Sequence, residues 1–344
     1  MTLCDIICGV VLLPRSNSAA EVILRHIIYQ NKMLKYIYDI TPLGEPFERD
    51  AFPCGLLSQL RQIMLKMVRM LFTGVVILVS FELAAAANCS RATLKEGVDR
   101  YIAAQSTGQI EWLEAVLASN VTYLENGKSL DINNSTLQQS IRVDRSHSIY
   151  DLTQCAAFTE LIDTTPDSPW VIGAQIWHYD GKISKIDRIL TTTGDWLFNS
   201  SSTLSHTLLE DWGEIPPNQR DTRETIQAAG DAYLDLFKNT SLPVPWGYPC
   251  ERLEGGAYTG RGFQNDTCNV GIPPGFNYTN PNRRHVIDES VGVVSILLEF
   301  GSIGNAPDSH EFRVEGGKLR FIHTMTYCEK KPNCGYSLPP MVRS

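Results

Sequence analysis

Two halves of the chain repeat the same order of short motifs, and this constrains the fold more than any other feature. YIAAQSTG at Tyr101 matches YLDLFKNT at Tyr233, and DGKISKID matches GGKLRFIH further along. Between them, His147-Ser-Ile matches His285-Val-Ile. The three offsets are 132, 138 and 136 residues. An order-preserving match at a nearly constant offset indicates an internal duplication.

Each half reads as helices followed by strands. Periodicity predicts helices at 93–106, 111–118, 135–143 and 222–238. Alternation and turn signals predict strands at 148–163, 170–179, 183–192, 285–300, 311–314 and 319–327. The stretch 242–281 reads as loop. This order predicts the α+β class: two tandem cone-shaped repeats, each with helices packed on a curved antiparallel sheet.

A secretory signal is expected within the chain rather than at its start. Residues 66–87 combine a cationic start, an apolar run of about a dozen residues and the small-residue site Ala85-Ala86-Ala87. The run is short for a membrane span, which needs about 20 residues. We interpret residues 1–65 as an over-extended gene model or a disordered segment. A buried core helix or a signal anchor is the alternative interpretation of 66–87.

The sequence also predicts how the chain after residue 87 divides into domains. The first cone-like domain is expected over 88–200, a linker over 201–220 and the second domain over 221–330. A C-terminal tail is expected over 331–344.

Cysteine count and glycosylation motifs both favour secretion. Six cysteines follow the cleavage site, an even number that suits three disulfides: Cys89, Cys155, Cys250, Cys268, Cys328 and Cys334. We expect Cys250 to pair with Cys268, and Cys89 to pair with the C-terminal region. Eight N-x-[ST] sequons lie after the cleavage site and none before it: Asn88, Asn120, Asn133, Asn134, Asn199, Asn239, Asn265 and Asn277.

Charge and motifs exclude several functions. With 30 basic and 38 acidic residues, the net charge is −8, and no basic tract offers the cationic face that nucleic-acid binding needs. The chain has no G-x-S-x-G, H-E-x-x-H, P-loop or G-x-G-x-x-G motif, which disfavours common hydrolases, metalloproteases and nucleotide enzymes. It also has no C-x-x-C pair, so no metal is expected.

A cone of sheet closed by helices encloses an apolar cavity, which binds small molecules through a few polar groups. A histidine beside a carboxylate is a candidate general acid or base there. The inward polar candidates are Tyr123, Asp144, His147, Trp177, Asp187, His285, Asp288, Glu299 and His323.

Several of these candidates have a structural alternative. His147 and His285 stand at equivalent repeat positions near Arg, which also suits an inherited structural contact. Trp177 suits a core position, and Asp187 beside Arg188 suits a surface pair. His178 and His310 are expected to be exposed, and the glycines of EGGAYTGRG favour an irregular loop over an anion cradle.

The half-repeat resembles the nuclear-transport-factor-two-like fold, shared by scytalone dehydratase and SnoaL-type polyketide cyclases. Longer strings are similar to a family of secreted fungal proteins that includes hetero-Diels–Alderases of tropolonic sesquiterpene biosynthesis. The resemblance covers nearly all of 88–328, through CSRATLKEGVDRYIAAQ, TYLENGKSLDI, GKISKIDRILTTTGDWLFN, RDTRETIQAAGDAYLDLF, PCERLEGGAYTG and DSHEFRVEGGKLRFIHTMT.

This resemblance implies cycloaddition between a tropolone quinone methide and a humulene-type alkene, with no cofactor. Holding diene and dienophile in a reactive geometry would supply most of the catalysis. A small apolar substrate is the expected partner, with no nucleic acid, no stable membrane span and a homodimer left open. The alternatives are another SnoaL-like dehydratase, cyclase or isomerase, and a non-catalytic secreted binding protein or effector.

Overall fold

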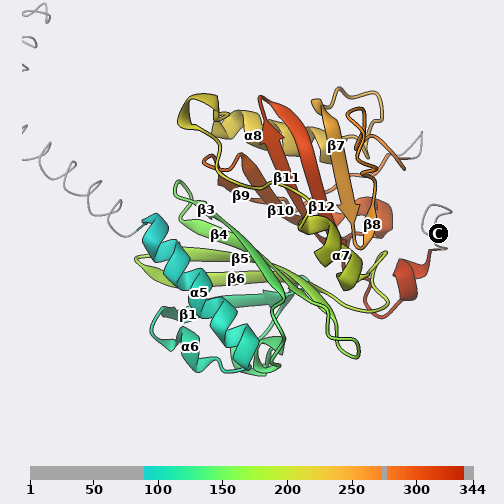
Figure 1. The fold of residues 1–344 in the computed structure, drawn as a ribbon. Helices are drawn as coiled ribbons and strands as arrows, with labels where there is room; N and C mark the ends of the chain where they lie inside the picture. Colours follow the sequence, from blue (N-terminus) through green and yellow to red (C-terminus); the bar gives the residue numbers. More distant parts are fainter. Residues whose placement is uncertain (1–88, 273–276, 337–344) are drawn as a thin grey trace, which may run out of the picture. The chain divides into compact units, whose positions relative to one another are not determined.

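The computed structural model describes residues 89–272 and 277–336 (Figure 1). The expected signal peptide over 66–87, the segment before it and the Asn88 sequon lie outside the described residues. The same holds for the tail from residue 337 onward.

The first domain places one long helix before a six-stranded sheet. The helices are α5 (Arg91–Thr107) and the short α6 (Glu111–Glu114), and two 3₁₀ turns follow at Ile132–Asn134 and Thr136–Gln138. The strands are β1 (Leu117–Glu125), β2 (Lys128–Ser129), β3 (Arg145–Asp151), β4 (Ala156–Asp163), β5 (Trp170–Tyr179) and β6 (Lys182–Thr191).

The second domain repeats this plan after a connecting helix, α7 (Ser200–Thr207). Its main helix is α8 (Arg223–Asp235). Its strands are β7 (Trp246–Glu254), β8 (Ala257–Tyr258), β9 (Arg284–Asp288), β10 (Val293–Phe300), β11 (Ala306–Glu315) and β12 (Lys318–Thr326). Further 3₁₀ turns lie at Pro217–Gln219, Gly301–Ile303 and Pro332–Gly335.

The two sheets have equivalent topology, which matches the sequence repeat. The strand orders are β2-β1-β6-β5-β4-β3 and β8-β7-β12-β11-β10-β9. β1 runs parallel to β6, and β7 runs parallel to β12, while the other pairs are antiparallel. The structure is therefore two tandem cone-like α+β domains, with mixed sheets rather than the purely antiparallel sheets expected.

Both main helices begin at a capping residue that the sequence supplies. The side chain of Ser90 accepts a hydrogen bond from the backbone N–H of Thr93, and Thr222 accepts one from Thr225. Gly108, at φ 69°, ends α5 in the left-handed conformation that glycine adopts without strain. In Figure 1, α5 lies across the first sheet and α8 across the second.

Several predicted elements need correction. The expected strands 148–163 and 285–300 are each two strands with a turn between them, β3–β4 and β9–β10. The expected helix over 135–143 is only short 3₁₀ structure, because Ser135 turns the chain by bonding to the Ile132 carbonyl. The expected loop over 242–281 contains β7 and β8, and the expected linker contains α7.

The two sheets pack against each other through a shared apolar layer. Ile149, Phe158 and Ile189 from the first domain join Val286 and Leu297 from the second. Reciprocal ion pairs lie at its edge. Arg91 at the start of α5 contacts Asp288 on β9 at 2.8 Å, and Arg223 at the start of α8 contacts Asp151 on β3 at 2.6 Å. This pairing resembles the isologous contact of a twofold dimer, made here within one chain.

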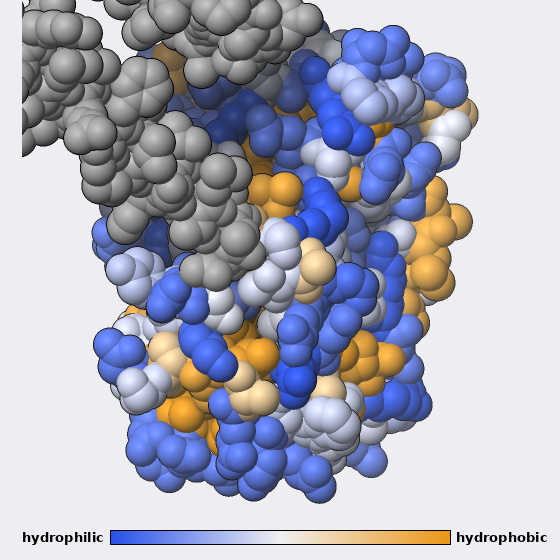
Figure 2. Space-filling model, turned by 90° about the vertical axis from the view of Figure 1, so that its left-hand side faces the viewer, coloured by the Kyte–Doolittle hydropathy of each residue, from blue (hydrophilic) through white to orange (hydrophobic). Residues whose placement is uncertain are grey.

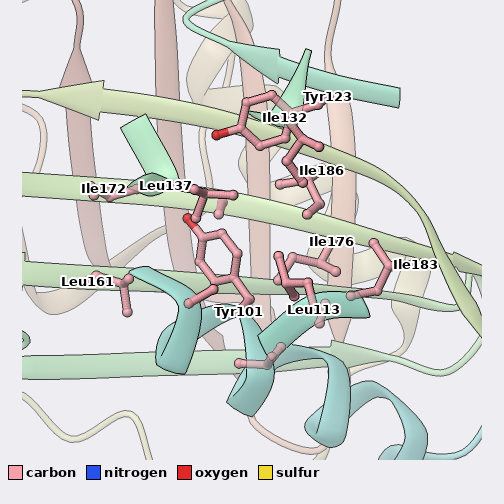
Figure 3. Packing of buried hydrophobic residues seen from close by; sticks show 14 of the residues in the cluster. Tyr101, Leu113, Tyr123, Ile132, Leu137, Leu161, Ile172, Ile176, Ile183 and Ile186 are labelled. Atoms are coloured by element: carbon pink, nitrogen blue, oxygen red, sulfur yellow. The ribbon is translucent and has the colours of Figure 1, made fainter. Parts of the chain in front are cut away.

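The interior of the first domain is filled with side chains. Tyr101, Leu113 and Tyr123 pack with isoleucines from β5 and β6 in a single cluster (Figure 3). The fully buried Arg188 crosses this interior, where one Nη donates to Gln105 and the other to the Tyr123 hydroxyl. The expected cavity in this half stays a prediction.

Three disulfides join all six cysteines that follow residue 88. Cys250 pairs with Cys268, as predicted. The expected bridge from Cys89 to the C-terminal region is wrong, because Cys89 pairs with Cys155 and Cys328 pairs with Cys334. The first bridge connects the start of α5 to the β3–β4 turn, within one domain.

The surface visible in Figure 2 is mainly hydrophilic, with apolar residues in separate patches. Among the described residues, no helix combines the length and the apolar character needed to cross a bilayer. The homodimer stays a prediction.

Candidate functional site

A cavity of about 1110 Å³ opens inside the second domain. Its wall combines Tyr233 from α8 and Phe237, which follows that helix, with Arg252 and Glu254 from β7. α7 closes one side through Ser202 and His206, and the glycine-rich segment 255–262 also contributes. The expectation that this segment is only an irregular loop is therefore incomplete, because it forms the β7–β8 turn and part of the cavity wall.

Alternation along β11 places a histidine and a carboxylate on the same inner face. Asp308 and His310 are two residues apart, so both side chains leave the same side of the strand. His310 lines the cavity, and its Nδ1 makes a short hydrogen bond with Asp308. Asp308 also accepts a hydrogen bond from Thr326 Oγ1 at 2.5 Å. His310 and Asp308 are 2% and 0% exposed, so the dyad is shielded from bulk water.

The dyad fixes which nitrogen of His310 is free. A carboxylate accepts hydrogen bonds, so Asp308 favours the tautomer with the proton on Nδ1. In this tautomer Nε2 carries a lone pair, and no described residue makes a hydrogen bond to Nε2. Nε2 is therefore the nitrogen available to a molecule in the cavity.

A second polar group faces the same cavity. The Tyr233 hydroxyl accepts a hydrogen bond from Arg252 Nη1 at 3.1 Å, which leaves its own proton free to be donated. Burial raises the pKa of Tyr233 above its usual range, although Arg252 opposes this, and the phenol therefore stays protonated at neutral pH. The Tyr233 and His310 rings lie 5.7 Å apart, with Phe300 and Phe312 beside the histidine. A proton acceptor and a proton donor thus share one mainly aromatic wall.

The first domain has apolar residues where the second has the dyad. In β11–β12, Asp308 pairs with Thr326 and His310 pairs with Thr324. In β5–β6, the same register pairs Ile172 with Leu190 and Ala174 with Arg188. Each pair of equivalent positions is 136 residues apart. The duplicated domains have therefore diverged at the positions of the dyad.

None of the catalytic candidates nominated from sequence lines this cavity. Tyr123 is in the first core, where its hydroxyl donates to Glu125. Asp144 is a surface group whose pKa falls to about 2, mainly because Arg142 bonds to it. Trp177 packs beside the layer between the sheets. Glu299 accepts from Asn282 on the surface.

The remaining nominated residues lie at or beside the contact between domains. Asp187 is paired with Arg284 of the other sheet at 2.8 Å, so the expected surface pair with Arg188 is wrong. Asp288 pairs with Arg91. His285 contacts Asp231 of α8 at 3.0 Å, which is a structural contact within the second domain.

His147 and His323 come together between the sheets, in one buried cluster with Glu160, Glu210 and Glu311. Burial opposes a charge on His323, but the Glu210 and Glu160 carboxylates outweigh it and raise the pKa of His323 to about 10. This cluster lies on the opposite face of β11 and β12 from the cavity, because Glu311 and His323 alternate with His310 and Thr324.

The alternating pattern of the sequence contains a signal for the dyad. His310 was expected to be exposed because the predicted strand began only at Glu311, whereas β11 begins at Ala306. Phe312 and Val314 belong to the core of the second domain, and His310 and Asp308 continue the same alternating face. His178 was also expected to be exposed but is 7% exposed.

Comparisons with known proteins match part of the chain to a family model and indicate no activity. Residues 219–326 match a domain of unknown function, DUF8021. No curated protein matches the chain. Similar solved structures include a proposed ketosteroid isomerase from Kribbella flavida at 16% identity, covering 30% of this chain and 80% of that one with a TM-score of 0.24.

Two further structures are similar at the same level. An NTF2-like protein of unknown function from Shewanella baltica has 10% identity, covering 30% of this chain and 94% of that one with a TM-score of 0.21. AclR, a proposed hydroxylase from Streptomyces galilaeus, has 9% identity, covering 45% of this chain and 100% of that one with a TM-score of 0.24. Similarity this low carries no argument about activity, which has to come from the cavity itself.

Proposed function

We propose that the second domain is an enzyme that uses His310 as a general acid and base on a small, mostly apolar organic molecule. The observation that carries the proposal is the buried Asp308–His310 dyad in the wall of a cavity of about 1110 Å³. Cavities with an apolar lining and a few convergent polar groups are the usual sites for such ligands.

The dyad performs proton transfer in two steps. His310 Nε2 takes a proton from a carbon or hydroxyl of the substrate, and Asp308 stabilises the imidazolium that forms. The proton then returns to another carbon for an isomerisation, or to a departing hydroxyl for a dehydration. The Tyr233 hydroxyl donates a hydrogen bond to the substrate oxygen that gains negative charge.

The finer proposal is hetero-Diels–Alder catalysis, which the resemblance to the fungal family implies. The dyad supports the first part of such a reaction, because proton transfer from His310 can assist loss of water to give a quinone methide. The cavity would then hold this diene against the alkene, and proximity would supply most of the rate increase.

Incubation of the full chain with hydroxymethyl-tropolone and humulenol tests both the acid–base proposal and the cycloaddition proposal. We expect adduct formation above the uncatalysed rate, and a loss of about 10²-fold or more in His310→Ala and Asp308→Asn. Glu315→Gln, on the exposed end of the same strand, is the matched control and should keep full activity. Adducts at the uncatalysed rate would reject the cycloaddition. If the control and His310→Ala then also turn over a panel of hydroxy-ketones equally, the acid–base proposal fails too.

We also propose that the protein enters the secretory pathway. Its six cysteines after residue 88 form three disulfides. All seven described sequon asparagines are exposed, as glycan attachment requires: Asn120, Asn133, Asn134, Asn199, Asn239, Asn265 and Asn277. N-terminal sequencing of the natural protein should find a start near Asn88, and glycosidase treatment should lower its apparent mass. A start upstream of Met64 would contradict the proposal.

A further inference from the structure

Three buried side chains from both domains converge between the two sheets. Glu160 comes from β4 of the first domain, while Glu311 and His323 come from β11 and β12 of the second. One ligand-type atom of each lies within 4.8 Å of the others. His147 on β3 adds a second imidazole, with its Nε2 3.3 Å from Glu311 Oε1. The four side chains form the inter-sheet cluster.

The inter-sheet cluster leaves strong polar atoms without hydrogen bonds. Glu311 is 2% exposed, yet neither carboxylate oxygen accepts a hydrogen bond from any described residue. Glu160 Oε1, His147 Nε2 and His323 Nδ1 are in the same state. An unsatisfied buried polar atom costs about 1–3 kcal/mol, and more when it is charged. Several such atoms lie close together, with one ligand-type atom each of Glu160, Glu311 and His323 within 4.8 Å of the others, which indicates a ligand that they share.

The orientation of His323 is fixed by a carboxylate behind it. Its Nε2 contacts Glu210 Oε2 at 2.5 Å, and Glu210 Oε2 also accepts a hydrogen bond from Trp212 Nε1 at 2.8 Å. The proton of Nε2 is therefore engaged, and Nδ1 faces Glu160 Oε2 at 3.7 Å. Metal-binding histidines characteristically donate their second ring N–H to a carboxylate in this way.

The carboxylates of this cluster and their spacing suit a metal ion. Among the described residues, Glu160, Glu210 and Glu311 make ion pairs with Arg145, 3.7 Å from Glu160, and with the imidazoles of His147 and His323. Ligands about 2.1 Å from a tetrahedral zinc ion lie about 3.4 Å from one another. The separations of 3.3 Å between His147 Nε2 and Glu311 Oε1 and of 3.7 Å between His323 Nδ1 and Glu160 Oε2 are close to this value.

We propose that Glu160, Glu311, His323 and His147 bind one divalent transition-metal ion, with zinc as the best match, and that this ion joins the two domains. Two imidazoles and two carboxylates suit zinc better than calcium or magnesium, which prefer oxygen ligands alone. A closed four-ligand set is typical of structural rather than catalytic zinc. Binding replaces the proton on His323 Nδ1, as metal binding to imidazole requires.

Metal content of the full chain tests the proposal. Protein produced in zinc-supplemented medium should hold about one zinc per chain by inductively coupled plasma mass spectrometry, and added zinc should raise the melting temperature of stripped protein. A zinc concentration of 100 times Kd should give a shift of about 5–10 °C. Glu311→Gln should lose both effects, whereas the matched control Glu315→Gln, exposed on the same strand, should keep them.

A second measurement keeps the test valid if Glu311→Gln does not fold. Cobalt bound to the unmodified chain should give the strong visible absorption of a tetrahedral site. Zinc well below one per chain, with no thermal shift and no cobalt spectrum, would overturn the proposal and leave ordered water or protons as the cluster's partners. Equal zinc content in Glu311→Gln and Glu315→Gln would overturn it as well.

Discussion

Replacing the dyad with the residues of the first domain should stabilise the protein and abolish the proposed acid–base chemistry. The variant Asp308→Ile, His310→Ala, Thr326→Leu installs the side chains that occupy the equivalent register in β5–β6. All three original residues are at most 2% exposed. Exchange of a buried ionic group for apolar residues of similar total volume is neutral or stabilising by about 1–4 kcal/mol. The dyad would thus be retained for function at a cost in stability.

Urea unfolding followed by tryptophan fluorescence and circular dichroism measures this change directly. We expect a gain of about 1–4 kcal/mol in unfolding free energy, with any turnover of an organic substrate lost. The reciprocal variant Ile172→Asp, Ala174→His, Leu190→Thr buries polar groups in a packed core and should lose more than about 3 kcal/mol. A loss of stability in the first variant, or retained turnover, would refute the reasoning.

Three further predictions concern the scaffold. Burial lowers the pKa of His178 to about 4 from its ordinary 6.5, so its neutral form favours the folded state above pH 6.5, and this contribution is lost as the pH falls towards 4. The shift corresponds to about 3 kcal/mol. The stability of the wild type relative to His178→Gln should therefore fall by that amount between pH 7.5 and 4 in urea titrations, and a constant difference would contradict it. Asp151→Ala leaves Arg223 without its buried partner and should cost about 3–5 kcal/mol in thermal unfolding, whereas Asp99→Ala, in the exposed pair with Lys95, should cost less than about 1 kcal/mol. Equal costs would remove the role given to the ion pair between domains. Gly230→Ala places a methyl group 3.1 Å from Phe312 and Val294, so overpacking of about 1–3 kcal/mol should exceed the helix gain of about 1 kcal/mol. A higher urea midpoint for this variant would show that α8 can move away.

The repeat and the pattern of strands made much of the fold predictable. β5 was expected over 170–179 and is found at Trp170–Tyr179, because hairpin signals mark its limits. β7 was missed because Pro245, Gly247 and Pro249 read as loop, although the strand pairs with β12 across the sheet. Such long-range pairing overrides local propensity.

The candidate site was harder to predict than the fold. Histidines were the main catalytic candidates, but His147 and His323 were expected inside the cones, whereas they face the other sheet. Strand alternation tells which residues share a face, but not whether that face lines a cavity or a contact between domains. That His147 and Glu311, 164 positions apart in the sequence, meet at 3.3 Å depends on how the two sheets pack.

The central claim is that the cavity of the second domain binds a small organic molecule beside His310, and a crystal structure with a bound ligand tests it most directly. Tropolone is a suitable ligand because it combines a small apolar ring with adjacent oxygens. The account predicts tropolone in the cavity of the second domain, with one oxygen about 3 Å from His310 Nε2. Tropolone bound elsewhere while that cavity holds only water, or a His310 ring turned away from Asp308, would contradict it.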